Sequence, residues 1–245
     1  MLQLPLSSCQ TVSPDWLPFI RKALETMDKG YIQTLSSTDN WLPGTAHLFS
    51  AFSLPLAKTQ FILLGESPYP RKASANGYAF WDAAVKDIWS LTGLSKTVNR
   101  ATSLRNFIKM LLLTHDYLEA NTLSQAAIAD ISKTRLIKTA QDLFENMQKK
   151  GILLLNASLV LSEQPIKYDA QHWFSFLLSL IRQLDQAGHP VHFILLGKIA
   201  EKILPFIPAH WPQPFIAAHP YNLSFIHDVA VQDFFKPFNL IYHSD

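Results

Sequence analysis

The sequence predicts an α/β fold: a single domain with a central four-stranded, mostly parallel twisted sheet, flanked by helices on both faces. Two observations lead to this prediction. Four short apolar runs of strand length lie along the 245 residues, and amphipathic helical patterns separate them. Strands that alternate with helices form parallel sheets, because each helix returns the chain to the start of the next strand. Apolar residues make up 48% of the chain, enough for a substantial core.

The four predicted strands are buried ones, because their residues are apolar on both faces. They are TQFILLG (59–65), GILLLNASLVL (151–161), VHFILLG (191–197) and PFIAAH (214–219). Each run is too short for a free-standing helix, and a Gly, Asn or His stands where its apolar stretch stops.

Helical patterns fill the intervals between these runs. Segment 13–27 opens with a Ser N-cap and Pro at N1, and segment 103–115 also begins at a serine. Segment 133–151 ends in Lys-Lys-Gly, a typical C-terminal signal. Segment 169–188 is amphipathic and closes on Ala-Gly. We therefore expect a helix in each of these four segments.

Composition excludes several classes of protein. The only cysteine is Cys9, which rules out an intramolecular disulfide and any cysteine-based zinc or iron–sulfur site. The stretch LSSC (6–9) is similar to a lipoprotein cleavage box, but it lacks a preceding basic segment and a long apolar run. No apolar run approaches the roughly 18 residues that span a bilayer. We expect a cytoplasmic protein without a membrane segment, a metal or an organic cofactor.

Polar residues gather where the predicted strands end. These ends carry Glu66–Tyr69, Asn156, Gly197–Lys198 and His219. Ligands of parallel sheets bind beyond the carboxyl ends of the strands, so we expect these residues at one functional edge. A formal net charge of only +2 permits nucleic-acid binding through a local patch but does not by itself argue for it.

Six segments, taken together and in order, resemble the uracil-DNA glycosylase superfamily, and in particular its main uracil-specific family. They are LLGESPYPRKASANGYAF (63–80), ATSLRNFIKMLL (101–112), GILLLNASLVL (151–161), FILLGKIAEKI (193–203), AHPYNLSF (218–225) and FFKPFN (234–239). The first is similar to the family's water-activating loop, usually Gly-Gln-Asp-Pro-Tyr-His and onward to Phe, without a change of length. The segment before it, 40–65, is also similar.

The resemblance implies an enzyme that hydrolyses the N-glycosidic bond of uracil flipped out of single- or double-stranded DNA, as in base excision repair. It implies that Asn156 reads the uracil N3–H and O4, because one amide offers both an acceptor and a donor. It also implies that Phe80 stacks on the flipped base and that Tyr69 excludes the methyl group of thymine. Without the resemblance, each has an ordinary structural interpretation.

The same resemblance assigns residues in the second half of the chain. His219 is expected to donate to uracil O2 and stabilise the departing anion, an electrostatic effect that is large in enzymes. Leu223 is expected to be the wedge that fills the gap left by the flipped base. The expected phosphate contacts, which position DNA without reading its sequence, are Ser103, Lys198 and Ser224.

The loop after the first strand departs from the family pattern. The family's water-positioning aspartate falls at Ser67, whose hydroxyl cannot accept the proton or offer a negative charge. Pro70 stands where a histidine is usual. Glu66 places a carboxylate beside the vacant position and makes the loop similar to the Gly-Glu-Ala-Pro loop of a cluster-bearing branch. Neighbouring residues of an extended chain point to opposite sides, so Glu66 replaces the aspartate only if a turn re-aims it.

These departures leave alternatives open. One is a catalytically weak or inactive homologue that binds DNA or a protein partner on the same scaffold. Another is a glycosylase for a different damaged base, which Tyr69 would oppose by blocking C5 substituents. We also expect one domain over residues 1–245, with an extra helical segment around 115–150 whose role the sequence does not indicate.

Overall fold

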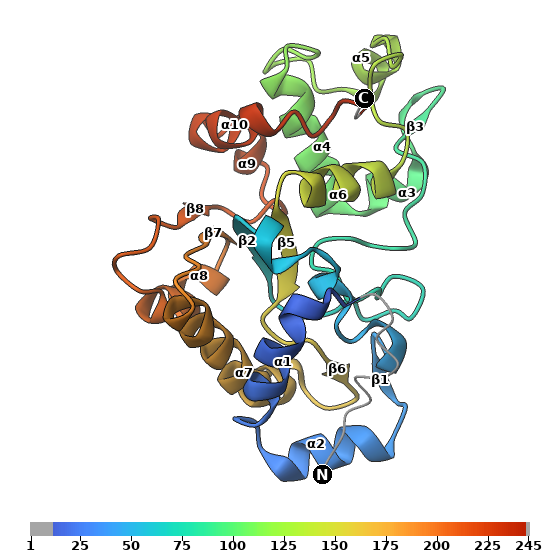
Figure 1. Ribbon diagram of the computed structural model, residues 1–245. Helices are drawn as coiled ribbons and strands as arrows, with labels where there is room; N and C mark the ends of the chain where they lie inside the picture. The colour runs from blue at the N-terminus through green and yellow to red at the C-terminus, as the bar shows by residue number, and fades with distance from the viewer. Residues whose placement is uncertain (1–11, 244–245) are drawn as a thin grey trace. The chain divides into compact units, whose positions relative to one another are not determined.

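The computed structural model describes residues 12–243, so Cys9 lies outside the described residues. Its central sheet has the strand order β5–β2–β7–β8 (Figure 1). Strand β2 (Phe61–Gly65) runs parallel to β5 (Ile152–Asn156) on one side and to β7 (His192–Leu196) on the other. Strand β8 (Phe215–Ala217) completes the sheet. The predicted α/β class with its four-stranded sheet is confirmed.

The remaining elements lie before, between and after these four strands along the chain. The α-helices are α1 (Leu17–Leu24), α2 (Lys29–Ser37), α3 (Lys96–Arg100), α4 (Thr102–Thr114), α5 (Gln125–Asp130), α6 (Ala140–Lys149), α7 (Ile166–Gln186), α8 (Ile199–Ile203), α9 (Ser224–His227) and α10 (Val229–Phe235). Two small antiparallel pairs are β1 (Trp41–Leu42) with β6 (Leu161–Ser162), and β3 (Trp89–Ser90) with β4 (Gly93–Leu94).

Two compact units make up the chain, and each is described by itself. The first unit comprises Met1–Asp82, Gly151–Leu195 and Ile199–Phe215. The second unit comprises Ala83–Lys150, Leu196–Lys198 and Ile216–Asp245. One domain over 1–245 stays a prediction.

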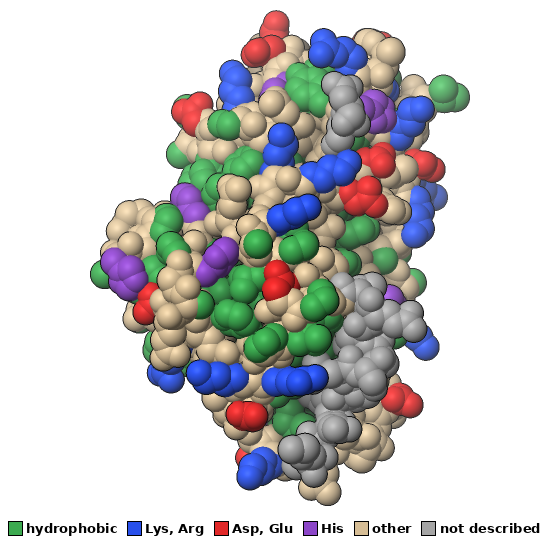
Figure 2. Space-filling view, in the orientation of Figure 1, with side chains coloured by type: hydrophobic (Ala, Val, Ile, Leu, Met, Phe, Trp, Pro, Cys, Tyr) green, Lys and Arg blue, Asp and Glu red, His purple; other side chains and the backbone are tan. Residues whose placement is uncertain are grey.

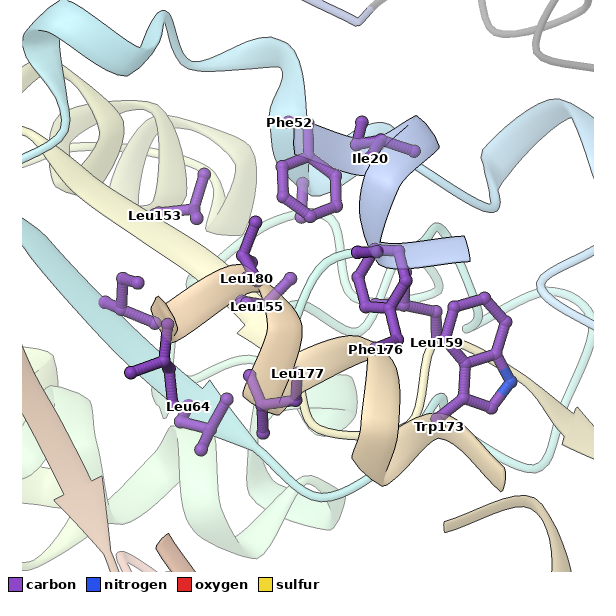
Figure 3. Packing of buried hydrophobic residues seen from close by; sticks show 14 of the residues in the cluster. Ile20, Phe52, Leu64, Leu153, Leu155, Leu159, Trp173, Phe176, Leu177 and Leu180 are labelled. Carbon is purple, nitrogen blue, oxygen red and sulfur yellow. The ribbon is translucent and has the colours of Figure 1, made fainter. Parts of the chain in front are cut away.

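The core of the first unit lies between the sheet and two helices. Leu64 of β2 and Leu155 of β5 pack with Phe176 of α7 and Ile20 of α1, all buried (Figure 3). Each side chain of this size contributes about 1.5–3 kcal/mol when it is fully removed from water. Leu154, on the opposite face of β5, is also fully buried, as expected for a strand covered on both faces.

Several predicted segments differ from the structure in their limits. The run 151–161 is a strand only to Asn156. The helix predicted from residue 133 begins at Ala140, where Thr139 and Asp142 form a capping box. Ser13 stands at the predicted N-cap position without a side-chain cap bond, and a 3₁₀ turn, Pro14–Trp16, precedes α1. Region 115–150 is helical only in α5 and α6, and its being an addition to the family pattern stays a prediction.

Helix α4 is the centre of packing in the second unit. Its Phe107 contacts Phe225 of α9, with ring centroids 6.0 Å apart, and Phe235 of α10, with centroids 5.0 Å apart in an edge-to-face arrangement. Such aromatic pairs add about 0.5–1.5 kcal/mol beyond the area that they bury. Helix α4 therefore anchors the loop that leads from β8 into α9.

The surface carries charges of both signs. Basic and acidic side chains are interspersed on the face shown in Figure 2, in keeping with the formal net charge of +2. Within residues 12–243, no helix combines the length and the apolar character that crossing a membrane requires.

Candidate active site

The loop after β2 and the chain after β5 remain side by side beyond the sheet. Gly65 pairs with Asn156 at the last position of the two strands. The Ala157 N–H donates to the Gly65 carbonyl at 2.8 Å, and the Ser158 N–H donates to the Glu66 carbonyl at 3.0 Å. These bonds hold the start of loop 66–82 against the end of β5, as expected for the carboxyl ends of neighbouring parallel strands.

Asn156 is the last residue of β5 and lies beside Gly65 of β2. Its side chain is only 4% exposed, and its carboxamide makes no hydrogen bond to any other residue of the described chain. A Cβ atom on Gly65 would lie 2.5 Å from Asn156 Oδ1 and 2.9 Å from Ala79 Cβ. The amide and Ala79 therefore both press against the bare Cα of Gly65. Buried amides normally find partners, so this one is available to a ligand as donor and acceptor.

Two cross-links hold loop 66–82 in shape. The Tyr69 hydroxyl donates to the Phe80 carbonyl at 3.1 Å. Arg71 Nη2 donates to Asp82 Oδ2, also at 3.1 Å, and Asp82 is buried. Burial, and then the charge of Asp82, raises the pKa of Tyr69 to about 12, so the phenol stays protonated at neutral pH and keeps its donor.

Phe80 has an unusual backbone. Its φ is +62°, in the left-handed region that bulky residues seldom adopt. The preceding residue, Ala79, donates its N–H to the Leu154 carbonyl at 3.0 Å, and the Tyr69 hydroxyl holds the Phe80 carbonyl. A conformation of this kind costs about 1–3 kcal/mol and persists where the surroundings enforce it, as at ligand sites.

Ser67 and Glu66 differ in exposure. The Ser67 side chain is half-buried, whereas Glu66 is exposed. Within residues 12–243 the Glu66 carboxylate makes neither a hydrogen bond nor an ion pair. A catalytic role for either side chain stays a prediction.

In the second unit, His219 packs against the glycine that follows β7. Gly197 has a φ of +86°, and a Cβ there would lie 2.9 Å from His219 Cβ. The Gly197 N–H donates to the Ala217 carbonyl at 2.9 Å. The positive φ and the close approach of His219 both require glycine at this position. Lys198, the next residue, is exposed.

The hydrogen bonds of His219 define its tautomer. The Tyr221 backbone N–H donates to His219 Nδ1 at 3.1 Å, and the Asn222 N–H donates to the His219 carbonyl at 2.9 Å. A backbone N–H is only a donor, so Nδ1 must act as the acceptor. The neutral ring then carries its proton on Nε2. The loop therefore presents His219 Nε2–H as a hydrogen-bond donor.

The expected DNA contacts also belong to the second unit. Leu223 is 67% exposed, directly before α9, and Ser224 is the exposed first residue of that helix. Ser103 is half-buried and is the second residue of α4, whose N-cap is Ala101. The helix predicted to start at Ser103 thus begins one residue earlier, and Ser103 is not its cap.

The predicted site residues are divided between the two units, and their assembly into one site stays a prediction. The first unit holds Glu66, Ser67, Tyr69, Phe80 and Asn156, and the second holds Ser103, Lys198, His219, Leu223 and Ser224. Among residues 12–243 there is no group of three or more His, Cys, Asp or Glu side chains arranged to hold a metal ion.

Two features that hold the site loops in place are not predicted from the sequence. One is the ion pair between Arg71 and Asp82. The other is Asn106 of α4, which is fully buried and bonded to the loop after His219. Asn106 lies in segment 101–112, which resembles the family, and it is a polar residue within an apolar pattern, but neither signal names its partner.

Several named proteins are similar in sequence to this chain over most of its length. It is 27% identical over 256 residues to the uracil-DNA glycosylase of Helicobacter pylori (strain Shi470), covering 99% of this chain and 98% of that protein. It is 30% identical over 183 residues to the uracil-DNA glycosylase of a Parafrankia species, covering 74% of this chain and 67% of that protein. No family model matches the chain.

Solved structures are similar over nearly the whole chain. The crystal structure of wild-type UNG from Nitratifractor salsuginis superposes with a TM-score of 0.89 at 34% identity, covering 96% of this chain and 94% of that one. The crystal structure of mimivirus uracil-DNA glycosylase superposes with a TM-score of 0.60 over 89% of this chain and 71% of that one. Its identity is 17%, so this second likeness is one of fold.

Proposed function

Because this chain belongs to the uracil-DNA glycosylase family, we propose how its own residues carry out the reaction. Its function is that of a uracil-DNA glycosylase-like enzyme, a hydrolase of the N-glycosidic bond. In this reaction the bond between C1′ and uracil N1 breaks, and the electron pair leaves with the base. The oxygen of a water molecule bonds to C1′, and one of the two water protons passes to solvent or to uracil N1. The products are an abasic site and free uracil. The substrate is DNA that contains uracil.

The proposal rests on the carboxamide of Asn156, which is buried and makes no hydrogen bond to another side chain or backbone group within residues 12–243. Its Oδ1 accepts from uracil N3–H, and its Nδ2 donates to uracil O4. Cytosine presents the opposite pattern at these two positions, so the same amide orientation leaves it unpaired. Since an unpaired buried polar group costs about 1–3 kcal/mol, this contact selects uracil over cytosine.

Tyr69 and Phe80 shape the pocket around the base. The Phe80 ring stacks on uracil, and the Tyr69 ring lies against C5 and excludes a methyl group. Support for the pairing comes from the Tyr69 hydroxyl, which holds the Phe80 backbone in its strained conformation. This exclusion also argues against a substrate with a substituent at C5.

His219 stabilises the leaving group. Its Nε2–H donates to uracil O2, where negative charge develops as the bond breaks. The Tyr221 N–H at Nδ1 supports this role, because it keeps the proton on the nitrogen that faces the base. Removing one donor of this kind costs about 10²–10³ in rate in other enzymes.

Leu223 and three polar residues hold the DNA. The 67% exposure of Leu223 suits a wedge that enters the base stack when the nucleotide is flipped. Lys198, Ser103 and Ser224 contact phosphates, which sets the position of the strand without reading sequence. With a low net charge, the protein depends on such local contacts.

Ser67 sets the rate of the reaction. Its hydroxyl orients the attacking water but takes no proton, and it offers no negative charge to the sugar. We expect a slower enzyme than a relative with aspartate here, by roughly 10²–10⁴. Glu66 is exposed, and we propose that it does not replace the aspartate. A homologue that only binds DNA or protein is not favoured by relatives that are uracil-DNA glycosylases by name.

The test is uracil release from single-stranded DNA that carries one uracil, under single-turnover conditions with excess protein. We expect abasic sites to form. We expect Asn156→Ala and His219→Ala to lower the rate at least about 10²-fold, whereas His227→Ala, at an exposed histidine of α9, leaves it unchanged. Failure to release uracil at any excess would refute the proposed reaction, and full activity in either site variant would refute that residue's role.

A further inference from the structure

Asn106 connects helix α4 to the loop that carries His219. Its side chain is fully buried, and Nδ2 donates to the Pro220 carbonyl at 2.8 Å and to the Tyr221 carbonyl at 3.3 Å. Arg105 Nε donates to Asn106 Oδ1 at 3.3 Å, which determines which end of the amide faces the loop. All of these residues belong to the second unit.

One peptide group links Asn106 to the imidazole. The Pro220 carbonyl and the Tyr221 N–H are the two ends of the same planar peptide unit. Its oxygen accepts from Asn106, and its N–H donates to His219 Nδ1. Because the unit is rigid, holding its oxygen also orients its hydrogen. Hydrogen bonds in such a chain also polarise one another, which strengthens the bond at Nδ1.

We propose that Asn106 is a positioning residue for His219: through the peptide group between Pro220 and Tyr221, it keeps the imidazole proton on Nε2. Asn106 itself does not touch the base. If the peptide rotates, Nδ1 loses its donor and the neutral ring is free to carry its proton on Nδ1. In that tautomer Nε2 is an acceptor and repels uracil O2 as negative charge builds. This inference rests on the proposed role of His219.

A second asparagine in the same unit supplies the matched control. Asn146 of α6 is 5% exposed, and its Nδ2 donates to two backbone carbonyls, Leu240 at 3.0 Å and Tyr242 at 2.8 Å. Asn146 thus holds the C-terminal segment by two hydrogen bonds to backbone carbonyls, as Asn106 holds the loop that carries His219. The two substitutions to alanine remove the same chemical group from sites that are both buried.

The experiment compares Asn106→Ala with Asn146→Ala in three measurements: thermal unfolding, single-turnover uracil excision, and the ¹⁵N NMR shifts of the His219 ring. We expect similar losses of unfolding temperature in both variants. Only Asn106→Ala should lower the maximal rate, by about tenfold or more but less than the 10²–10³ of losing a whole donor. Only this variant should move the His219 nitrogens toward a mixture of tautomers. The protein concentration that gives half of the maximal single-turnover rate should change much less than the maximal rate itself.

Equal rates in the two variants, or an unchanged His219 tautomer in Asn106→Ala, would overturn the inference. His219→Ala separates this failure from failure of the proposed function. If that variant keeps full activity, the role of His219 itself is wrong; if it loses activity while the asparagine variants match, only the role of Asn106 is wrong. Should Asn106→Ala not fold, Asn106→Ser keeps one donor in a smaller side chain, and the same rate and NMR readouts decide.

Discussion

Gly65→Ala is a direct test of the geometry around Asn156. The residue ends β2 and its backbone is not in the left-handed region, so alanine fits the backbone itself. The added Cβ would lie 2.5 Å from Asn156 Oδ1 and 2.9 Å from Ala79 Cβ. The change therefore perturbs the two neighbours of the proposed base pocket and leaves their chemical groups intact.

The expected size of the effect follows from these distances. Cβ atoms essentially never approach closer than 3.0 Å, and ordinary contacts begin at 3.4 Å, so Oδ1 must move by 3.0 − 2.5 = 0.5 Å to 3.4 − 2.5 = 0.9 Å. A misplacement of about 1 Å costs roughly 10²-fold in rate, or about 2.7 kcal/mol at 1.36 kcal/mol per tenfold. We expect Gly65→Ala to lower kcat/KM for uracil excision by about 10²-fold.

The assay is single-turnover excision together with thermal unfolding, and Gly188→Ala is the control. Gly188 follows α7 with a φ of +63°, and a Cβ there would meet nothing within 4 Å. Alanine at this position strains the backbone by about 1 kcal/mol and should lower stability without changing excision. Excision by Gly65→Ala within twofold of the unsubstituted protein would refute the placement of the Asn156 amide at the base.

Three further predictions follow from the site. Ser67→Asp should raise the single-turnover rate roughly 10²–10⁴-fold by restoring a general base, and an unchanged rate would mean that this position does not face the sugar. The pKa of Tyr69 is raised to about 12 from its ordinary value of 10.0, so its contribution to stability is complete below pH 10 and is lost as the pH rises toward 12. Tyr69→Phe should therefore weaken the fall in unfolding free energy at alkaline pH. Parallel plots of unfolding free energy against pH for the two proteins would contradict the burial of that hydroxyl. Leu223→Ala should slow excision from double-stranded DNA more than from single-stranded DNA, because only a duplex leaves a gap to fill; Val229→Ala, at a residue of similar exposure, is the control, and equal losses on both substrates would exclude a wedge.

Hydrophobicity predicts burial more reliably than it predicts the kind of element. The run 151–161 is apolar to its end, and Leu159 and Val160 are buried in the core. The strand nevertheless stops at Asn156, because its partner β2 ends at Gly65 and the Ser158 N–H already bonds to Glu66 of the loop that follows. The strand boundary therefore depends on a partner far away in sequence.

The start of α6 shows the same dependence. Leu136 and Ile137 match a helical pattern, but Leu136 bridges to Tyr242 and the Ile137 N–H donates to the Ile241 carbonyl. Backbone pairing with the C-terminal segment keeps these residues out of the helix. Thr139 and Asp142 then start it with a capping box, a local signal that the sequence contains but that the longer apolar pattern obscures.

The sequence by itself determined the four strands of the central sheet, four of the helices, the buried runs, and the residues at the strand ends, Asn156 and His219 among them. These features follow from local periodicity and from the rule that parallel strands end at one edge. Only the tertiary structure decided the partners of those residues: the bare Cα of Gly65 beneath the Asn156 amide, and Asn106 behind the His219 loop. A contact between residues 106 and 220 is set by the packing of whole elements, and no local pattern encodes it.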